Sequence, residues 1–341
     1  MKTKYPTSVL ERCLKALVVG YGSIGQRHIS NLLSFPNIEI LVCTNRKYDT
    51  FLRKKKCKIF DSIEKCLKEK PDFAIITNVT SLHIKTAIQL ANSGINLLIE
   101  KPLSDTLDGV QTLLKIIKKR KLTTLMGCVL RFHPCIRKIK EIVSNDMVGR
   151  IISVIVENGS YLPYWHLSEN YLSSYAARED LGGGVTLTSI HEIDYLYWFF
   201  GGVKEVYSIT GKFSDLELSV DDLSASLLRF KNNIIAEVHL DYFQNPSFRS
   251  CKIIGTKGTI YWNSETNTVK VYDIKRKKWI QKLKLKNYDW NTMYIKEIHH
   301  FLNCVKKKEK PINDVYEGAK VLKIALAIKK SSKIRKEIVI D

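Results

Sequence analysis

The feature that most constrains this chain is a group of three glycines between an apolar run and an amphipathic one. In "ALVVGYGSIGQRHISNL" they are Gly20, Gly22 and Gly25. In this spacing the first glycine permits a sharp turn, the second lets a phosphate approach the backbone, and the third lets a helix pack closely on the strand. The N–H groups at the helix start, including those of Ser23 and Ile24, form an anion site at the positive end of the helix dipole. The stretch therefore predicts a dinucleotide-binding turn.

The surrounding pattern supplies the context that such a turn requires. Apolar, β-branched strands alternate with amphipathic helices as far as Gly127, which is typical of a parallel sheet covered on both faces. The expected strands are "ALVVG", "IEILVCTN", "PDFAIITNV", "INLLIEKP" and "LTTLMGCVL". The expected helices are "GQRHISNLLSF", "FDSIEKCLKE", "SLHIKTAIQLANSG" and "TLDGVQTLLKIIKKRK". We expect a doubly wound Rossmann domain over residues 1–127.

The pattern changes after this point. Strand-like segments separated by short loops such as "GTKG" and "KNN" indicate a large open, mostly antiparallel sheet. Helical patterns accompany them in "FHPCIRKIKEIV", "GGVTLTSIHEIDYLYWFFG", "YIKEIHHFLNCVKKKE" and "VYEGAKVLKIALAIKKSS". The 341 residues suit two domains. We therefore expect a second, α+β domain over residues 128–341.

The end of the second strand bears on the choice of nucleotide. In "VCTNRK", Thr44 stands where a carboxylate would hold the ribose 2′-hydroxyl of NAD, and Asn45, Arg46 and Lys47 follow. An arginine here can form charge-assisted hydrogen bonds with a 2′-phosphate. The sequence favours NADP over NAD, although Arg46 read alone is also compatible with a solvated surface charge.

"LLIEKPLSDT" places Lys101 at the carboxyl end of an apolar strand, where ligands of parallel sheets bind. Pro102 stiffens the turn that follows. An ammonium at this point can hydrogen-bond a substrate hydroxyl or carbonyl and stabilise developing negative charge. Taken by itself, Lys101 also fits an ordinary surface lysine.

The glycine turn, "TNVTSLHIKTA", "EKP" and "GGGVTLTSIHEID" occur in this order, and together they resemble the Gfo/Idh/MocA family of glucose-fructose oxidoreductase and inositol dehydrogenase-like enzymes. The resemblance runs from about Ala16 to the last helix. It implies a Rossmann domain, a C-terminal domain with an open sheet that often forms the oligomer contact, and hydride transfer between a nicotinamide and a carbon of a sugar or polyol.

By matching position, the resemblance implies that Lys101 and His191 are the catalytic lysine and the acid/base histidine. Glu100 then resembles a supporting partner of the lysine, and Asp194 resembles the acid that follows the histidine. The segment lining the cofactor after the third strand is matched by Thr77, Asn78 and His83. Without this context, His191 would be read as a buried histidine of an amphipathic helix.

One position departs from the family pattern. The family usually carries an aspartate three or four residues before the histidine, in D-x-G-x-H, where this chain has Leu187, Thr188 and Ser189. Proton transfer would then fall on His191 and Lys101, with Thr188 as a candidate for the supporting role.

Two segments, "LRFHPCIRKI" and "NGSYLPYWHLSENYLSSYAAREDLGGG", are expected to supply the substrate pocket. Arginines clamp carboxylates or phosphates, and aromatic rings stack on sugars, although the aromatic residues can equally serve packing. The candidates, which indicate an anionic sugar such as a nucleotide sugar or sugar acid, are Arg131, Arg178, Tyr161, Trp165, His166 and Tyr175.

Composition narrows the function classes. The net charge of +21 comes from lysines scattered along the chain, and this is read as a solvated surface or as an attraction for phosphate-bearing substrates. The eight cysteines form no C-x-x-C pair, so no metal site is expected. With no signal-peptide pattern or membrane span, we expect a cytoplasmic protein that binds neither membrane nor nucleic acid. The resemblance implies a homodimer or homotetramer formed through the C-terminal sheet as the second domain's role, together with substrate binding. A cofactor-binding regulatory protein without catalysis is the alternative.

Overall fold

The computed structural model describes residues 13–46, 50–165, 167 and 170–340. The chain clusters into two compact units. Unit 1 runs to Leu103, resumes over Asp108–Gly127 and closes with Tyr294–Tyr316, and unit 2 comprises Ser104–Leu107, Cys128–Met293 and the chain from Glu317 onward. The main crossing between the two units falls between Gly127 and Cys128. The difference is that Tyr294–Tyr316, expected in the second domain, belongs to unit 1.

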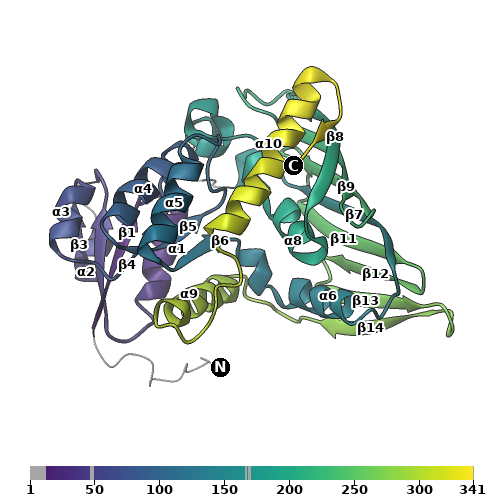
Figure 1. The fold of residues 1–341 in the computed structure, drawn as a ribbon, viewed down its shortest axis with the longest axis horizontal. Coiled ribbons are helices and arrows are strands. Elements are labelled where there is room, and N and C mark those ends of the chain that lie inside the picture. The colour runs from purple at the N-terminus through teal and green to yellow at the C-terminus, as the bar shows by residue number, and fades with distance from the viewer. Residues whose placement is uncertain (1–12, 47–49, 166, 168–169, 341) are drawn as a thin grey trace. The chain divides into compact units, whose positions relative to one another are not determined.

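Unit 1 contains a six-stranded sheet in the order β3-β2-β1-β4-β5-β6, with all neighbours parallel (Figure 1). The strands are β1 (Leu14–Val19), β2 (Ile38–Cys43), β3 (Lys58–Phe60), β4 (Phe73–Ile76), β5 (Asn96–Glu100) and β6 (Thr124–Gly127). The strand order reverses between β1 and β4. A doubly wound sheet binds its ligand at the carboxyl ends of the strands on either side of this point. The predicted Rossmann architecture is confirmed.

The helices of unit 1 bury one face each against this sheet. They are α1 (Ser23–Leu32), α2 (Thr50–Lys54), α3 (Ile63–Lys68), α4 (His83–Asn92), α5 (Val110–Arg120) and most of α9 (Asn291–Val305), together with the 3-10 turn η1 (Thr80–Leu82). The core joins β1, β2 and α1 to the apolar face of α9, which contributes Ile298, Phe301 and Leu302. Phe301 packs edge-on against Phe73 of β4, with ring centroids 5.6 Å apart.

Unit 2 contains a nine-stranded sheet in the order β14-β13-β12-β11-β7-β10-β9-β8-β15. Its neighbours are antiparallel except for β7 and β10, which are parallel. The strands are β7 (Ile151–Gly159), β8 (Val203–Gly211), β9 (Leu223–Phe230), β10 (Ile235–Asp241), β11 (Phe248–Gly255), β12 (Gly258–Asn263), β13 (Thr268–Asp273), β14 (Lys278–Lys284) and β15 (Ile338–Val339). The expected mostly antiparallel second sheet is confirmed.

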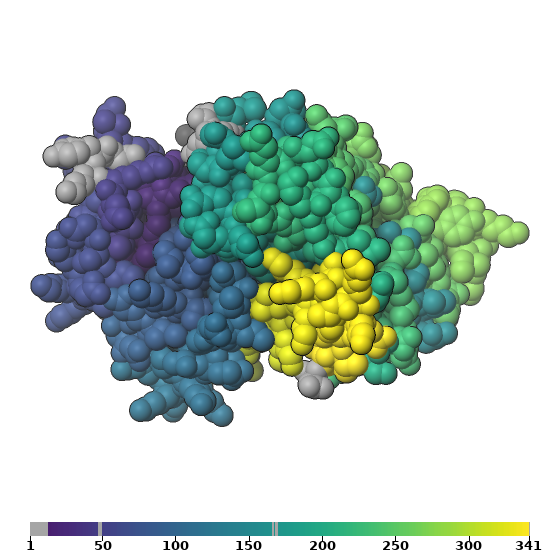
Figure 2. Space-filling view, turned by 90° about the horizontal axis from the view of Figure 1, so that it is seen from above, coloured from purple at the N-terminus to yellow at the C-terminus, as the bar shows by residue number. Residues whose placement is uncertain are grey.

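One face of this sheet carries helices. These are α6 (Pro134–Ser144), α7 (Val185–Thr188), α8 (His191–Phe200) and α10 (Val315–Ile334), with the 3-10 turns η2 (Val129–Phe132), η3 (Leu162–Tyr164), η4 (Tyr171–Ser173), η5 (Tyr175–Ala177) and η6 (Glu179–Leu181). Ser208 of β8 donates its hydroxyl to the carbonyl of Ile328 in α10 at 2.6 Å. Helix α10 and the chain after it, yellow in Figure 2, lie at the surface in that view. Strands β9 and β10 alternate between buried and exposed residues over most of their length, which is the period expected for a sheet covered on one face.

Besides the 3-10 turns, four elements were not predicted: α2, β3, β14 and β15. Strand β3 spans only Lys58–Phe60 and β15 only Ile338–Val339. Strands as short as these two carry no readable hydrophobic period, and each pairs with one neighbouring strand, β2 or β8.

Candidate functional site

The three glycines of the turn after β1 have different surroundings. A Cβ on Gly20, where φ is +102°, would lie 2.6 Å from the main-chain nitrogen of Asn78. A Cβ on Gly25 would lie 2.4 Å from the carbonyl oxygen of Gly20. Both glycines are therefore required by packing inside unit 1. A Cβ on Gly22 would meet no atom within 4 Å, so this glycine faces open space.

The start of α1 is suited to an anion. Gly22 is the N-cap and supplies no side-chain hydrogen bond, and the first turn carries no acidic residue. The first intrahelical bond runs from the Gln26 N–H to the Gly22 carbonyl at 2.9 Å, so the N–H groups of Ser23, Ile24 and Gly25 lack a helical acceptor. Three free donors, a helix dipole and open space above Gly22 fit a diphosphate.

The loop after β4 packs against the glycine turn and is hydrogen-bonded to it. The hydroxyl of Thr77 donates to the carbonyls of Val19 and Gly20, both at 3.0 Å. The Asn78 amide donates to Thr86 at 2.9 Å. These contacts fix the shape of the turn, and they give Thr77 and Asn78 a structural role next to the predicted cofactor site.

His83 joins the loop after β4 to the turn after β5. Its Nδ1 lies 2.8 Å from the carbonyl oxygen of Pro102, and its Nε2 lies 2.9 Å from that of Asn78. Burial lowers the pKa of His83, against the opposing effect of these two carbonyls. The ring therefore positions two loops at the carboxyl edge of the sheet.

The end of β2 carries no carboxylate. The Thr44 N–H donates to the Phe60 carbonyl at 2.9 Å, and the Thr44 hydroxyl accepts from the Arg46 N–H at 3.2 Å. Asn45 and Arg46 are exposed, and the Arg46 guanidinium lies 5.9 Å from the centre of the Tyr21 ring. Lys47 lies outside the described residues.

Lys101 follows β5 directly, and in the parallel register it stands at the same edge as the glycine turn, because Val19 pairs with Ile76 and Ile76 with Ile99. Its main-chain N–H donates to the Glu100 carboxylate at 3.3 Å. Glu100 is buried, and its other oxygen lies 2.7 Å from the Nε2 atom of His28. The sequence analysis did not single out His28.

In unit 2, His191 is the first residue of α8 and is partly exposed. The preceding residues that stand in place of the family aspartate are enclosed: Leu187 is 1% exposed and Thr188 4%. The Ser189 hydroxyl accepts from the Asn158 amide at 3.1 Å. At the position where the D-x-G-x-H pattern has its aspartate, this chain therefore has a buried leucine, Leu187.

Two residues near His191 were missed. Glu192 is fully buried, and one of its oxygens lies 2.7 Å from the Nε atom of Arg249 in β11. A glutamate within the largely apolar stretch of α8 requires a partner once it is buried, which is a signal that the sequence already contained. The arginine that pairs with it was not recognisable from spacing.

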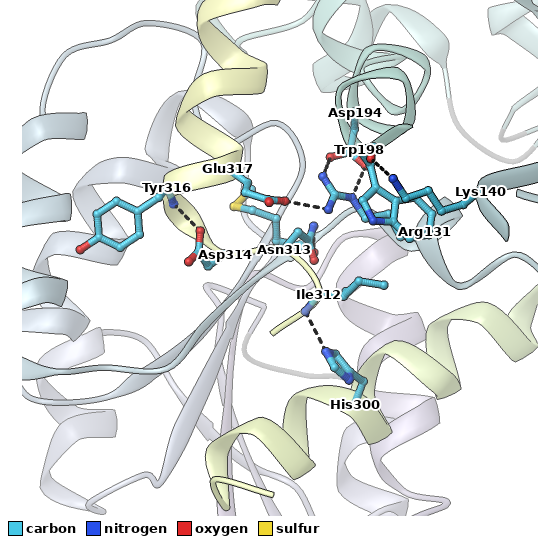
Figure 3. A network of polar contacts seen from close by, with 11 residues as sticks. Arg131, Lys140, Asp194, Trp198, His300, Ile312, Asn313, Asp314, Tyr316 and Glu317 are labelled. Atoms are coloured by element: carbon cyan, nitrogen blue, oxygen red, sulfur yellow. Dashed lines mark hydrogen bonds and ion pairs between the residues drawn. The ribbon is translucent and has the colours of Figure 1, made fainter. Parts of the chain in front are cut away.

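The structure assigns Arg131 a role other than clamping a substrate. Its guanidinium is fully buried and bonds both oxygens of Asp194, at 2.9 and 2.8 Å. A third bond reaches the Glu317 carboxylate at 2.7 Å (Figure 3). Burial alone would lower the pKa of Arg131, but Asp194 more than offsets it and the pKa is raised. Since Arg131 and Asp194 neutralise each other, we do not propose either as a substrate ligand.

The aromatic candidates of unit 2 are largely engaged in packing. Trp165 donates its indole N–H to Ser160 at 2.9 Å and packs edge-on against Tyr242. Tyr161 stacks at right angles on Tyr164, with centroids 4.8 Å apart. Arg178 is half-exposed and pairs with the exposed Asp180. His166 lies outside the described residues.

The fold and the site together define a dinucleotide-binding oxidoreductase. The model of the oxidoreductase family with an NAD-binding Rossmann fold matches residues 14–128, and that of the GFO/IDH/MocA C-terminal domain matches residues 136–261. The chain belongs to the Gfo/Idh/MocA family.

Several relatives and solved structures match this chain over almost its whole length. The chain is 24% identical to myo-inositol 2-dehydrogenase of Thermotoga maritima, in an alignment covering 95% of this chain and 98% of that one. Its fold is similar to the WlbA dehydrogenase of Bordetella pertussis in complex with NADH and UDP-GlcNAcA (TM-score 0.83, 19% identity, 97% and 99% covered). It is also similar to levoglucosan dehydrogenase in complex with NADH (TM-score 0.85, 17% identity, 96% and 99% covered). Within the described residues, no helix is both long and apolar enough to cross a bilayer.

Proposed function

We propose that this enzyme transfers a hydride between a nicotinamide dinucleotide and a hydroxyl- or carbonyl-bearing carbon of a sugar or sugar derivative. The observation that carries the proposal is the position of Lys101, which follows β5 at the sheet edge that holds the glycine turn. When bound, the nicotinamide supplies or accepts the hydride. The diphosphate is held by the N–H groups that follow Gly22.

The chain's own residues provide the proton chemistry. The Lys101 ammonium hydrogen-bonds the reacting oxygen and stabilises negative charge on it in the transition state. His191 takes the hydroxyl proton in oxidation and returns it in reduction. Because Leu187 stands in place of the family aspartate, no carboxylate at that position assists His191, and we assign the supporting role to Thr188.

We propose an anionic sugar as the substrate, such as a nucleotide sugar or a sugar acid. The net charge of +21 attracts anions, and WlbA, which shares the fold, was solved with the nucleotide sugar acid UDP-GlcNAcA. With Arg131 held by Asp194, the half-exposed Arg178 becomes the first candidate for contact with the anionic group, alongside Tyr161.

The test is a pair of substitutions, Lys101→Ala and His191→Ala, assayed against a panel of nucleotide sugars and sugar acids. Each variant is expected to bind nicotinamide nucleotide as the wild type does, and to lose at least ~100-fold in kcat, since both residues act on the reacting oxygen. Lys115→Ala, at an exposed position of α5, is the matched control. Near-normal turnover in either variant would remove that residue from the mechanism.

A second candidate is a nicotinamide-binding regulatory protein without catalysis, and the buried Leu187 is the observation that favours it. The fluorescence of bound reduced nicotinamide distinguishes the enzyme from the regulatory protein. Reduced nicotinamide bound to the catalyst loses its fluorescence when the right oxidised sugar is added, whereas in a regulatory protein no sugar of the panel changes it.

We also propose that NADP is preferred to NAD. Arg46 is exposed after β2, and no carboxylate stands at Thr44 to repel a 2′-phosphate. The variant Arg46→Asp is expected to weaken NADP binding at least tenfold more than NAD binding, because a charge-assisted hydrogen bond is replaced by repulsion. Lys54→Asp makes the same change of charge at an exposed position of α2. It controls for the general electrostatic attraction between the protein and a nucleotide. Equal losses for both nucleotides would reject the assignment.

A further inference from the structure

Helix α9 brings a buried carboxylate to the core of unit 1. Glu297 is fully buried, although its neighbour Lys296 is exposed. One oxygen of Glu297, one oxygen of Glu100 and a ring nitrogen of His28 all lie within 4.8 Å of one another. Three segments far apart in the sequence, α1, the end of β5 and α9, thus meet in one buried polar cluster.

Within the cluster Glu100 is held on several sides. One oxygen lies 2.7 Å from the Nε2 atom of His28, and the other accepts the main-chain N–H of Lys101 at 3.3 Å. On a further side is Gly127, where a Cβ would lie 2.9 Å from the carboxyl carbon of Glu100. A shift of the His28 ring therefore moves Glu100, and a shift of Glu100 breaks its bond to the main chain of Lys101.

The His28 ring is itself held from α9. Tyr294, one turn before Glu297, packs edge-on against it, with centroids 6.1 Å apart and planes at 81°. The Arg27 guanidinium lies 4.6 Å from the centre of the Tyr294 ring. Burial raises the pKa of Tyr294 to about 12, so the phenol stays neutral. The charged side chains that act on Tyr294 are Arg27, Glu100 and Glu297.

Two carboxylates this close in a dry site repel each other unless a proton donor lies between them. The imidazole of His28 is the group placed to act as that donor. Glu297, whose carboxylate lies in the same cluster, thus favours the ring orientation that keeps the Nε2 atom on Glu100.

We propose that Glu297 is a positioning residue for the proposed reaction: through His28 and Glu100 it fixes the turn that aims Lys101. The inference rests on the proposed role of Lys101. One histidine and two carboxylates are also a ligand set for a divalent metal, but the 2.7 Å between His28 and Glu100 is a hydrogen-bond distance, and so we assign the cluster to hydrogen bonding.

The first test is kinetic. Glu297→Gln keeps the shape of the side chain and removes its charge. We expect kcat to fall about tenfold or more, since small displacements of a catalytic group are costly, while KM for the sugar and the cofactor Kd stay within about threefold. Glu265→Gln, the same change at an exposed turn between β12 and β13, is expected to match the wild type.

A double-mutant cycle separates positioning from general destabilisation. If Glu297 acts through His28, then His28→Gln reproduces the loss in kcat, and Glu297→Gln combined with His28→Gln adds little to it. Fully additive losses would overturn the proposal. Should Glu297→Gln fail to fold, Glu297→Asp, which keeps the carboxylate, enters the same cycle.

A second measurement does not depend on turnover. The proposal requires faster hydrogen–deuterium exchange of the peptide containing the Lys101 amide in Glu297→Gln, with unchanged exchange in unit 2 and in Glu265→Gln. Unchanged exchange there, or a stoichiometric divalent metal in the purified wild-type protein, would overturn it. If the wild type turned over no sugar while this exchange effect remained, the proposed function would fail and the positioning would stand.

Discussion

Gly22 and Gly25 belong to one sequence motif, but their surroundings assign them different tasks. A Cβ on Gly25 would lie 2.4 Å from the Gly20 carbonyl, whereas a Cβ on Gly22 would meet nothing within 4 Å. The first glycine serves the packing of α1 on β1, and the second keeps the anion site open. The motif already predicted this division of tasks, and the atoms around the Gly25 Cβ show the close packing of α1 on β1.

This difference predicts opposite outcomes for two alanine variants. Gly25→Ala should lower the free energy of unfolding by about 1–3 kcal/mol, because a methyl group is forced into occupied space. Gly22→Ala should unfold at the wild-type temperature and bind nicotinamide nucleotide at least tenfold more weakly. Thermal unfolding and fluorescence titration of both variants measure this. A stable Gly25→Ala with normal affinity would contradict the packing argument.

At the scale of elements, Arg131 connects three segments of unit 2. It lies in η2 and bonds Asp194 in α8 and Glu317 at the start of α10 (Figure 3). Nearby, Lys140 of α6 donates to the Trp198 carbonyl of α8 at 2.7 Å. Sequence reasoning treated Arg131 and Arg178 alike, as anion clamps. Only the fold shows that one is sealed among helices and that the other is half-exposed.

The two arginines therefore provide a matched stability test. Arg131→Met leaves the buried Asp194 without its partner and should cost about 3–5 kcal/mol in the free energy of unfolding. Arg178→Met breaks an exposed pair with Asp180 and should leave the free energy of unfolding close to that of the wild type. Urea denaturation of both variants gives the comparison. Similar small losses would mean that the Arg131 network is not a structural connection.

At the scale of the whole molecule, unit 1 is not continuous in the sequence. The segment Tyr294–Tyr316 returns to it after strands β7 to β14 of the second sheet. This segment is also hydrogen-bonded to β6, the strand at one side of the first sheet: the Asn313 amide donates to the Met126 carbonyl at 3.1 Å. A domain border drawn from the alternation of strands and helices could not reveal this, because α9 has an ordinary amphipathic pattern that fits either domain.

A fragment of residues 1–127 should therefore be unstable by itself. It lacks Ile298, Phe301 and Leu302, whose burial at about 1.5–3 kcal/mol each approaches the total stability of a typical domain. Joining residues 294–316 to the fragment through a flexible linker should restore cooperative unfolding, as measured by circular dichroism. A cooperative transition in residues 1–127 alone would show that α9 is dispensable.

The sequence by itself determined most of the elements of the first sheet and the glycine turn that follows β1. The period of apolar residues, the glycine spacing and the "EKP" turn are local signals, and each follows from how a few adjacent residues occupy a strand, a turn or a helix start.

The tertiary structure alone decided the partners: Asp194 for Arg131, Arg249 for Glu192, and Glu297 for His28 and Glu100. A buried charge must be matched within a few ångströms, and which residue arrives there depends on how distant segments are packed. No local pattern encodes that contact.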